Sequence, residues 1–320
     1  MASAQQRPQY TQYLFNNYIL NPAITGIENY IDVKAGYRNQ WIGLDGAPVT
    51  NYISVHGPIG YSPGDANSVG QGGDSPMSRS YLQTYRASEP HHGIGMHAVV
   101  DKAGPIGRVD VNATYAYHLG LTEKINVSFG VGIGVSQINL DVSKIILEEA
   151  IDPAIISTES NQIKPDLSAG LWVYGPRYFI GLSSQQLLGQ TLSFTNQTGS
   201  AYNTGKSVPH FFLTAGYKAF ISEDIAAMPS VMVKKVSNIN SVDANLKLAF
   251  RDKFWLGGSY RVKDSFSAMA GFNVSYLFNL SYSYDFTTSD LRSVNNGTHE
   301  IVLGLLLNNR YKVTCPQHNW

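Results

Sequence analysis

Histidines at two places in the chain are the residues whose chemistry could support metal binding or catalysis. His91 and His92 are adjacent, with Glu89 and His97 close by in the sequence. Neighbouring residues of an extended chain point to opposite sides, and no fourth ligand has the spacing of a zinc site. We therefore interpret these side chains as polar loop residues and predict no metal site.

His118 is the second candidate, because a histidine can activate a serine as a nucleophile. No Gly-x-Ser-x-Gly element accompanies it, so a histidine in a polar network is the preferred interpretation. The glycines of Gly130-x-Gly132-x-Gly134 lie inside a predicted strand, which is the wrong context for a phosphate-binding loop. Alternate glycines in a strand instead make room for something packed against it, or permit curvature. The sequence predicts neither an enzyme nor a cofactor.

The composition excludes several classes of protein. Charged residues make up 14% of the 320 residues, against about 25% in an ordinary soluble domain. The net charge is zero and Lys and Arg form no block, so nucleic acid is not an expected partner. No apolar run approaches the length of a transmembrane helix. The one cysteine, Cys315, excludes an intrachain disulfide.

Most of the chain alternates between apolar and polar residues. Phe278, Leu280 and Tyr282 share one side, for example, with Asn279 and Ser281 on the other. Side chains of a strand alternate between two faces, so this pattern predicts strands with one apolar face. The predicted strands are 30–43, 48–58, 92–101, 107–121, 125–140, 164–175, 177–188, 209–221, 224–236, 241–252, 254–263, 265–275, 277–287 and 298–308.

Two architectures could use such strands, a soluble sandwich or a membrane barrel. Strands of about ten to fifteen residues exceed the five or six that are usual in soluble sheets and suit a tilted crossing of the bilayer. Small and polar residues on the second face suit a water-containing lumen. We therefore predict an all-β, antiparallel outer-membrane barrel of about 14 strands, and the last strand must pair with the first because lipid permits no open edge.

The connections support this prediction with one exception. If both termini are periplasmic, the periplasmic turns are short and the long connections 141–163, 189–208 and 288–297 face outward. The connection 59–91 falls on the periplasmic side and is nevertheless long. Either it hides an extra hairpin or it is a periplasmic insertion, which we prefer. In strand 125–140 the alternation changes phase at Gln137, which predicts a bulge or a strand end there.

The two ends of the chain lie outside the predicted barrel of residues 30–308. Residues 5–29 have apolar residues at helical spacing up to Asn21, and Pro22 ends that pattern. This predicts a short N-terminal helix docked at the periplasmic mouth or in the lumen. Ala2-Ser3-Ala4 has the small-x-small form of a signal-peptidase site, so we interpret residues 1–4 as a signal-peptide remnant, with an ordinary N-terminus as the alternative. Residues 309–320 form a predicted periplasmic tail.

Several blocks spread over nearly the whole chain resemble PorP/SprF-type membrane proteins of the type IX secretion and gliding machinery of the Bacteroidota. The connection 59–91 departs from them, because typical members look shorter there. The matching blocks are the opening segment Gln9 to Gly26, Gln40 to Pro48, His56-Gly57-Pro58, Asp101 to Pro105, the closing segment Tyr282 to Ile301, and Cys315-Pro316 with the terminal aromatic Trp320.

This resemblance implies a non-enzymatic outer-membrane protein that serves secretion. Its implied partners are the outer-membrane lipids, the C-terminal domain of a secreted adhesin, the type IX translocon, and the periplasmic ring or peptidoglycan-associated lipoproteins. The predicted docking residues are in the N-terminal segment, the first and last outer connections and the tail: Tyr10, Tyr13, Phe15, Trp41, Asp290, Arg292, Cys315 and Trp320. The alternative function is a channel or transporter for a small hydrophobic solute.

Overall fold

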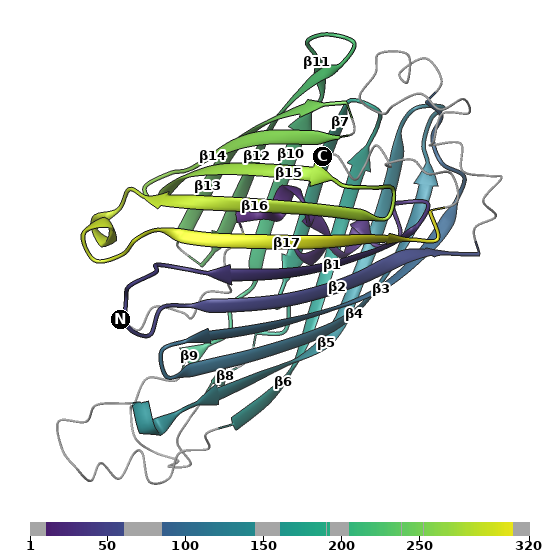
Figure 1. The fold of residues 1–320 in the computed structure, drawn as a ribbon. Helices are drawn as coiled ribbons and strands as arrows, with labels where there is room; N and C mark the ends of the chain where they lie inside the picture. The colour runs from purple at the N-terminus through teal and green to yellow at the C-terminus, as the bar shows by residue number, and fades with distance from the viewer. Residues whose placement is uncertain are drawn as a thin grey trace.

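The chain folds into a closed antiparallel β-barrel around a segment of its own N-terminus (Figure 1). The computed structural model describes residues 11–60, 85–144, 161–189, 191–192, 205–237, 239–251 and 253–309. The wall strands are β1 (Ile31–Asn39), β2 (Val49–Ile59), β3 (His91–Ala103), β4 (Ile106–Gly120), β5 (Asn126–Leu140), β6 (Asn161–Tyr174), β7 (Tyr178–Gln185), β10 (His210–Tyr217), β11 (Ala219–Phe220), β12 (Ile225–Val236), β13 (Ile239–Phe250), β14 (Phe254–Arg261), β15 (Ser265–Asn273), β16 (Phe278–Thr287) and β17 (Thr298–Leu307).

Within the described ranges the wall has 14 strands, as the sequence predicts. β10 and the two-residue β11 form one wall strand, interrupted at Lys218, because both pair with β12. β1 pairs antiparallel with β17, from Ile31 opposite Leu307 to Asn39 opposite His299, which confirms the predicted closure. The short hairpin of β8 (Thr191–Leu192) and β9 (Gly205–Lys206) forms a separate two-stranded sheet.

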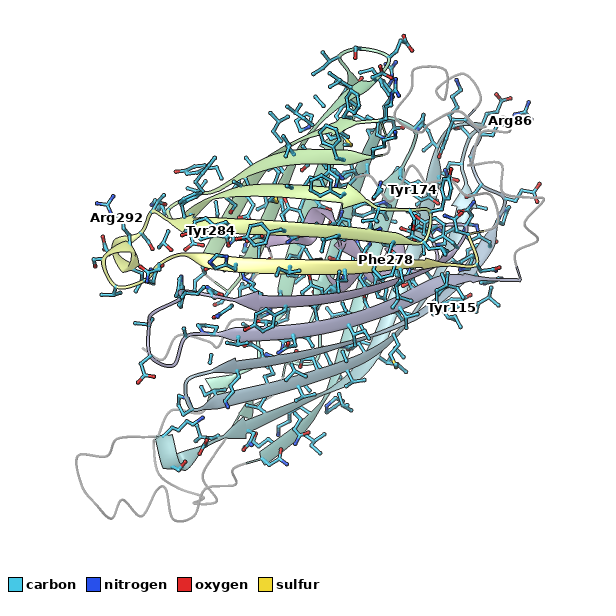
Figure 2. All side chains as sticks on the ribbon, viewed as in Figure 1. Arg86, Tyr115, Tyr174, Phe278, Tyr284 and Arg292 are labelled. Carbon is cyan, nitrogen blue, oxygen red and sulfur yellow. The ribbon has the colours of Figure 1, made fainter. Side chains whose placement is uncertain are left out.

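Alternation along each strand separates an outer apolar face from an inner polar face. In β5, Phe129, Val131 and Ile133 are exposed, whereas Ser128 lies in the interior. The exposed faces carry aliphatic and aromatic side chains around the wall, as Tyr115 and Phe278 illustrate in Figure 2. A barrel whose outer surface is apolar and whose interior is polar is the arrangement that a lipid bilayer requires. The predicted assignment of the two faces is confirmed.

None of the helices in the described part of the chain is long and apolar enough to cross a bilayer.

The N-terminal segment differs from the α-helix of about a dozen residues that its spacing predicts. It forms three short 3-10 turns, η1 (Thr11–Leu14), η2 (Asn17–Ile19) and η3 (Pro22–Ile24), and it lies inside the barrel rather than at its mouth. The Asn21 side chain accepts a hydrogen bond from the Ala23 amide and so caps the start of η3, whose first residue is Pro22. Carbonyl groups here are bound by side chains of the barrel wall, so a continuous helix is not needed to satisfy them.

Two further details of the fold resolve expectations from the sequence. β5 keeps an uninterrupted register with β4 as far as Leu140, so the predicted bulge at Gln137 is wrong. Ile138 faces inward, where its side chain is buried and shares a small pocket with Leu188. β2 and β3 pair directly, so the connection 59–91 adds no strand to the wall between them. Residues 61–84 of that connection lie outside the described residues.

The barrel has two distinguishable ends. We call the end where β1 begins and β17 ends the N-terminal end of the barrel, after the start of β1, although Thr11 lies nearer the other end, beside Arg38 and Glu300. At this N-terminal end the connections at 121–125, 175–177, 221–224, 251–253 and 274–277 are short. The far end carries η5 (Val142–Lys144) and η6 (Asp290–Ser293). Arg292 marks the far end and Arg86 the N-terminal end in Figure 2. The predicted long connections 141–163, 189–208 and 288–297 fall at the far end, as the parity requires, but short connections at 104–105 and 262–264 lie there too.

Candidate functional site in the barrel lumen

Residues 11–30, which we call the lumenal segment, cross the interior of the barrel from one wall to another. Thr11 contacts β16 and β17, Leu20 contacts β7, and Gly26 contacts β2. Most of its apolar side chains are buried, Tyr13 and Tyr18 at 2% exposure each. The lumenal segment is therefore part of the core of the barrel.

Glycines in the wall allow the backbone of the lumenal segment to approach closely. A Cβ atom at Gly130 of β5 would overlap the backbone of Pro22 and Ala23, and one at Gly93 would overlap the Thr25 carbonyl. A Cβ atom at Gly170 would overlap the side chain of Asn21. The interpretation that glycine at Gly130 makes room in the lumen is confirmed. The other two glycines of that series face wall side chains, Ser168 and Asn112.

Replacing Gly130 with alanine should push the lumenal segment away from β5. Overpacking of a well-packed site costs about 1–3 kcal/mol. The neighbouring atoms here belong to the backbone, so they do not move aside as a flexible side chain would. Hydrogen exchange of residues 11–30, measured by mass spectrometry, should become faster. Gly107→Ala is the matched control, because a Cβ there has no neighbour nearer than 3.9 Å. Equal exchange in both variants would show that the segment does not depend on this contact.

Wall side chains bind the backbone carbonyl groups of the lumenal segment. Gln185 Nε2 donates to the Ile19 carbonyl at 2.7 Å, and Ser183 Oγ donates to the Leu20 carbonyl at 2.7 Å. Within η3, Ser128 Oγ of β5 donates to the Ala23 carbonyl at 2.7 Å. These bonds replace the intrahelical bonds that an α-helix would supply and fix the position of the segment along the barrel axis.

Tyr13 and Tyr18 of the lumenal segment are neutral hydrogen-bonding groups. The Tyr18 hydroxyl lies 2.7 Å from Thr114 Oγ1, and Asn245 Nδ2 donates to the Tyr13 hydroxyl. Burial is the main cause that raises the pKa of each phenol above its ordinary value. Tyr13 is one of the predicted docking residues, and its hydroxyl is committed to the inside of the barrel.

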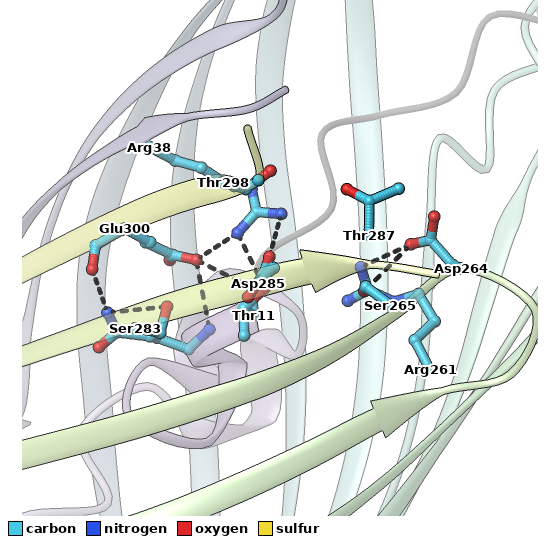
Figure 3. A network of polar contacts seen from close by, with 12 residues as sticks. Thr11, Arg38, Arg261, Asp264, Ser265, Ser283, Asp285, Thr287, Thr298 and Glu300 are labelled. Carbon is cyan, nitrogen blue, oxygen red and sulfur yellow. Dashed lines mark hydrogen bonds and ion pairs between the residues drawn. The ribbon is translucent and has the colours of Figure 1, made fainter. Parts of the chain in front are cut away.

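A charged network fixes the first residue of the described segment (Figure 3). Arg38 Nη1 donates to Glu300 Oε2 at 2.9 Å, and Nη2 donates to Asp285 Oδ2 at 2.8 Å. The Thr11 amide donates to Glu300 Oε2 at 2.9 Å, and the Thr11 hydroxyl donates to Asp285 Oδ2 at 2.6 Å. The three charged side chains are at most 2% exposed, so the interactions act in a low-dielectric environment where they are strong.

Strand register explains why these three charges meet. Arg38 of β1 lies directly opposite Glu300 of β17, and Glu300 lies opposite Ser283 of β16. Asp285 follows Ser283 by two residues and so shares the lumenal face. Three side chains from the strands around the β1–β17 closure therefore converge on one point of the lumen.

His118 and His91 form a second group of contacts with the lumenal segment. Their rings stack 4.5 Å apart, and His118 Nε2 lies 2.8 Å from the Thr25 carbonyl while His91 Nε2 lies 3.2 Å from the Gly26 carbonyl. His118 Nδ1 lies 3.2 Å from the Tyr174 hydroxyl. Both nitrogens of His118 are therefore committed to structural contacts, which is the polar-network role predicted for it. His91 is buried and His92 exposed, so the two point to opposite sides as predicted, but both are strand residues of β3 and not loop residues.

A third group lies at the N-terminal end of the lumen, where Glu28, Asp32 and His56 converge. His56 Nδ1 lies 3.5 Å from Glu28 Oε2, and His56 Nε2 lies 3.8 Å from Asp32 Oδ2. Burial, with the neighbouring carboxylate of Asp32, raises the pKa of Glu28 to about 8. Lys34 Nζ donates to Asp32 Oδ2 at 2.7 Å. The prediction of no metal site considered other histidines and did not consider this group.

The predicted docking residues are not brought together. Tyr13 and Phe15 are buried in the lumen, and Phe15 lies beside Trp255 and under the Lys34 ammonium group. Trp41 is half-buried in the connection between β1 and β2, and Asp290 and Arg292 are exposed in η6 at the far end. The remaining three, Tyr10, Cys315 and Trp320, lie outside the described residues.

Sequence reasoning missed the residues that hold the lumenal segment. Arg38, Asp285 and Glu300 were assigned to strands but not singled out, and Glu28 and His56 were not considered together. A signal was present, because Arg38, Asp285 and Glu300 are charged residues on the polar face of their strands. Their mutual contact depends on which strand closes against which, and that information is not local.

Comparison with known proteins gives the family and the fold. The sequence profile of the family described as "Type IX secretion system membrane protein PorP/SprF" matches residues 2–305. No curated protein sequence matches the chain. The solved structure of the Acinetobacter baumannii outer membrane protein Omp33 is similar with a TM-score of 0.50 and 8% identity, over 88% of this chain and 100% of that one. The CymD monoaromatic hydrocarbon channel has a TM-score of 0.47 and 11% identity, over 95% and 93% of the two chains.

Proposed function

The chain belongs to the PorP/SprF family of type IX secretion system membrane proteins, and from that premise we propose that it acts as a closed docking barrel of this machinery in the outer membrane. In this proposal the barrel holds the C-terminal domain of a secreted adhesin at its far end. Its N-terminal end contacts periplasmic secretion components, either the periplasmic ring or peptidoglycan-associated lipoproteins. The protein performs no catalysis in this role.

One observation carries the proposal, namely that the lumen is crossed by a segment that the wall holds at several separate points. Thr11 is fixed by a charged network on β1, β16 and β17, and Leu20 and Ala23 are fixed by serines of β7 and β5. A barrel that transports solute needs a continuous path through its interior. A barrel with a fixed segment across its interior instead acts through the surfaces that remain accessible at its two ends.

At the far end, the connection between β16 and β17 offers such a surface. Asp290 and Arg292 are exposed, and the neighbouring Leu291 and Val294 are 37% and 52% exposed. Charged residues beside exposed apolar ones are a usual composition of a protein interface, with the apolar groups contributing buried area and the charges orienting the partner. This connection lies beside the closure of β17 on β1 (Figure 1).

Co-purification after gentle detergent extraction tests the proposal. The unmodified protein should recover type IX secretion components together with a secreted adhesin. The double variant Asp290→Ala/Arg292→Ala should recover several-fold less adhesin and the same amount of periplasmic components, because only the far end is altered. The matched control is Asp224→Ala/Arg251→Ala, which removes an exposed ion pair of 2.8 Å at the N-terminal end.

Each failure has a distinct meaning. If the unmodified protein recovers no secretion component, the docking function is wrong. If the far-end double variant recovers as much adhesin as the unmodified protein, the adhesin binds elsewhere. If the control loses adhesin equally, the effect of the far-end variant reflects general damage rather than a binding surface.

The alternative function is a channel or transporter for a small hydrophobic solute. It requires the lumenal segment to move aside or to leave a continuous passage. Single-channel recording in planar bilayers separates the two functions, because a docking barrel stays closed whereas a channel conducts without any substitution. The number of fixed contacts on the lumenal segment favours the docking barrel.

A further inference from the structure

Two carboxylates and an imidazole meet where the lumenal segment joins the wall. Glu28 belongs to the lumenal segment, Asp32 to β1 and His56 to β2. Asp32 and His56 are direct partners in the register of β1 and β2, so their side chains share the lumenal face. One ligand atom from each of the three residues lies within 4.8 Å of the others. Three different parts of the chain thus contribute donor atoms to one point.

All three side chains are buried. Glu28 is 4% exposed, Asp32 is 1% exposed and His56 is 3% exposed. Lys34 Nζ, at 2.7 Å from Asp32 Oδ2, supplies one positive charge against two carboxylates. Ionising both carboxylates would exceed that positive charge by one. A buried charge without compensation is costly, and a bound cation would remove that cost.

The arrangement of donors and acceptors at Glu28 also favours a bound cation. Glu28 Oε2 is buried and accepts no hydrogen bond from the described residues. It is directed at His56 Nδ1, 3.5 Å away, and that nitrogen itself accepts the amide proton of Gly26 at 3.1 Å. Two atoms that both carry lone pairs therefore face each other. A metal cation is an electron-pair acceptor and fits between such groups.

We propose that Glu28, Asp32 and His56 bind one divalent transition-metal cation of the Zn²⁺ type, which fastens the lumenal segment to β1 and β2. One imidazole nitrogen with two carboxylate oxygens is a donor set that suits first-row transition metals. Ca²⁺ and Mg²⁺ take oxygen ligands almost entirely and should not bind here. A water molecule would complete a tetrahedral set.

Neighbouring residues already orient two of the three ligands. Lys34 holds one oxygen of Asp32, and a carboxylate has a second oxygen with which to bind a metal. The His56 ring packs on Tyr18, with ring centroids 4.3 Å apart. Groups of this kind, which bind the ligands rather than the metal, tune and position metal sites.

Equilibrium dialysis of the detergent-solubilised full-length protein tests this proposal. After treatment with a chelator and its removal, the protein should bind one equivalent of Zn²⁺ or Co²⁺, and Ca²⁺ in excess should not displace it. Glu28→Gln and His56→Asn each remove one ligand and should weaken binding by at least tenfold. Two single variants are used so that a folding failure of one leaves the other informative.

His97→Asn is the matched control. His97 is buried on the adjacent strand β3 and also contacts Tyr18, with ring centroids 5.5 Å apart, but it lies outside the three-residue cluster. This variant should bind Zn²⁺ as the unmodified protein does. Binding of less than one equivalent by the unmodified protein would overturn the proposal. So would unchanged binding by both Glu28→Gln and His56→Asn, since the metal would then be held elsewhere.

Discussion

Replacing Arg38 with methionine should release the start of the lumenal segment from the barrel wall. The substitution leaves Asp285 and Glu300 buried side by side without the guanidinium group that pairs with both, at 2.8 and 2.9 Å. Removing one partner of a buried ion pair typically costs about 3–5 kcal/mol, because the remaining charge is stranded. The carboxylates would then recruit water or protons, and Thr11 would lose the partners that hold its amide and hydroxyl groups.

Hydrogen exchange at Thr11 and Gln12 measures this release directly. Every 1.4 kcal/mol corresponds to a tenfold change in an equilibrium constant, so protection of these amides should fall about a hundredfold or more. Planar-bilayer recording of the same variant should show conductance events that the unmodified protein lacks. These two readouts report on the lumenal segment rather than on the wall.

The triple variant Arg38→Met/Asp285→Asn/Glu300→Gln is the matched control for charge. It removes the arginine as well, but leaves no buried charge unpaired, and replacing a whole buried ion pair is often close to neutral. We expect it to recover most of the lost protection. If Arg38→Met alone exchanges as slowly as the unmodified protein, the network is not what holds the segment.

An arginine in place of Ile133 should destabilise the folded barrel in the membrane. Ile133 is near the middle of β5, on the outer face, with 65% of its surface exposed. A basic residue facing lipid at the middle of the bilayer costs about 2–4 kcal/mol, whereas the cost falls to about 0–1 kcal/mol near the interface. The free energy of unfolding in lipid vesicles, measured by urea titration, should fall by the larger amount.

Val274→Arg is the control for position. Val274 is 71% exposed in the connection between β15 and β16 at the N-terminal end of the barrel, so an arginine there can reach the headgroups or water. The two substitutions should therefore differ in effect although both add one charge to an exposed apolar site. Equal costs would mean that the outer face of β5 is not embedded in hydrocarbon.

The strands and their two faces could be predicted because their signal is local. A period of two in Val127 to Val135 is enough to separate lipid-facing from lumen-facing residues, whatever the neighbouring strands are. Strand length and the absence of an open edge in lipid then require closure, which predicts the pairing of β17 with β1. Where the local signal misled, at Gln137, the cause is that Ile138 packs inside the mouth of the barrel beside Leu188. Because Ile138 is an apolar residue on the inner face, the apolar–polar alternation of the sequence changes parity there although the strand itself is continuous.

The structure of the N-terminal segment could not be predicted from its local sequence pattern. Its apolar spacing predicts a helix, but Asn21 and Pro22 interrupt the chain and wall residues such as Ser183 and Ser128 take over the bonding of its carbonyl groups. Those partners are more than one hundred residues away in the sequence. Local propensity describes a short segment poorly when its hydrogen-bond partners are supplied by a surrounding wall.

The sequence by itself determined the membrane barrel, its strand count, the direction of each face and, through the resemblance to its family, the association with type IX secretion. Only the tertiary structure decided that residues 11–30 cross the lumen, that Arg38 joins Asp285 and Glu300 around Thr11, and that Glu28 meets Asp32 and His56. The physical reason is the range of the interactions. Alternation is encoded between residues two apart, whereas Thr11 and Glu300 are 289 residues apart and meet only once the barrel has closed.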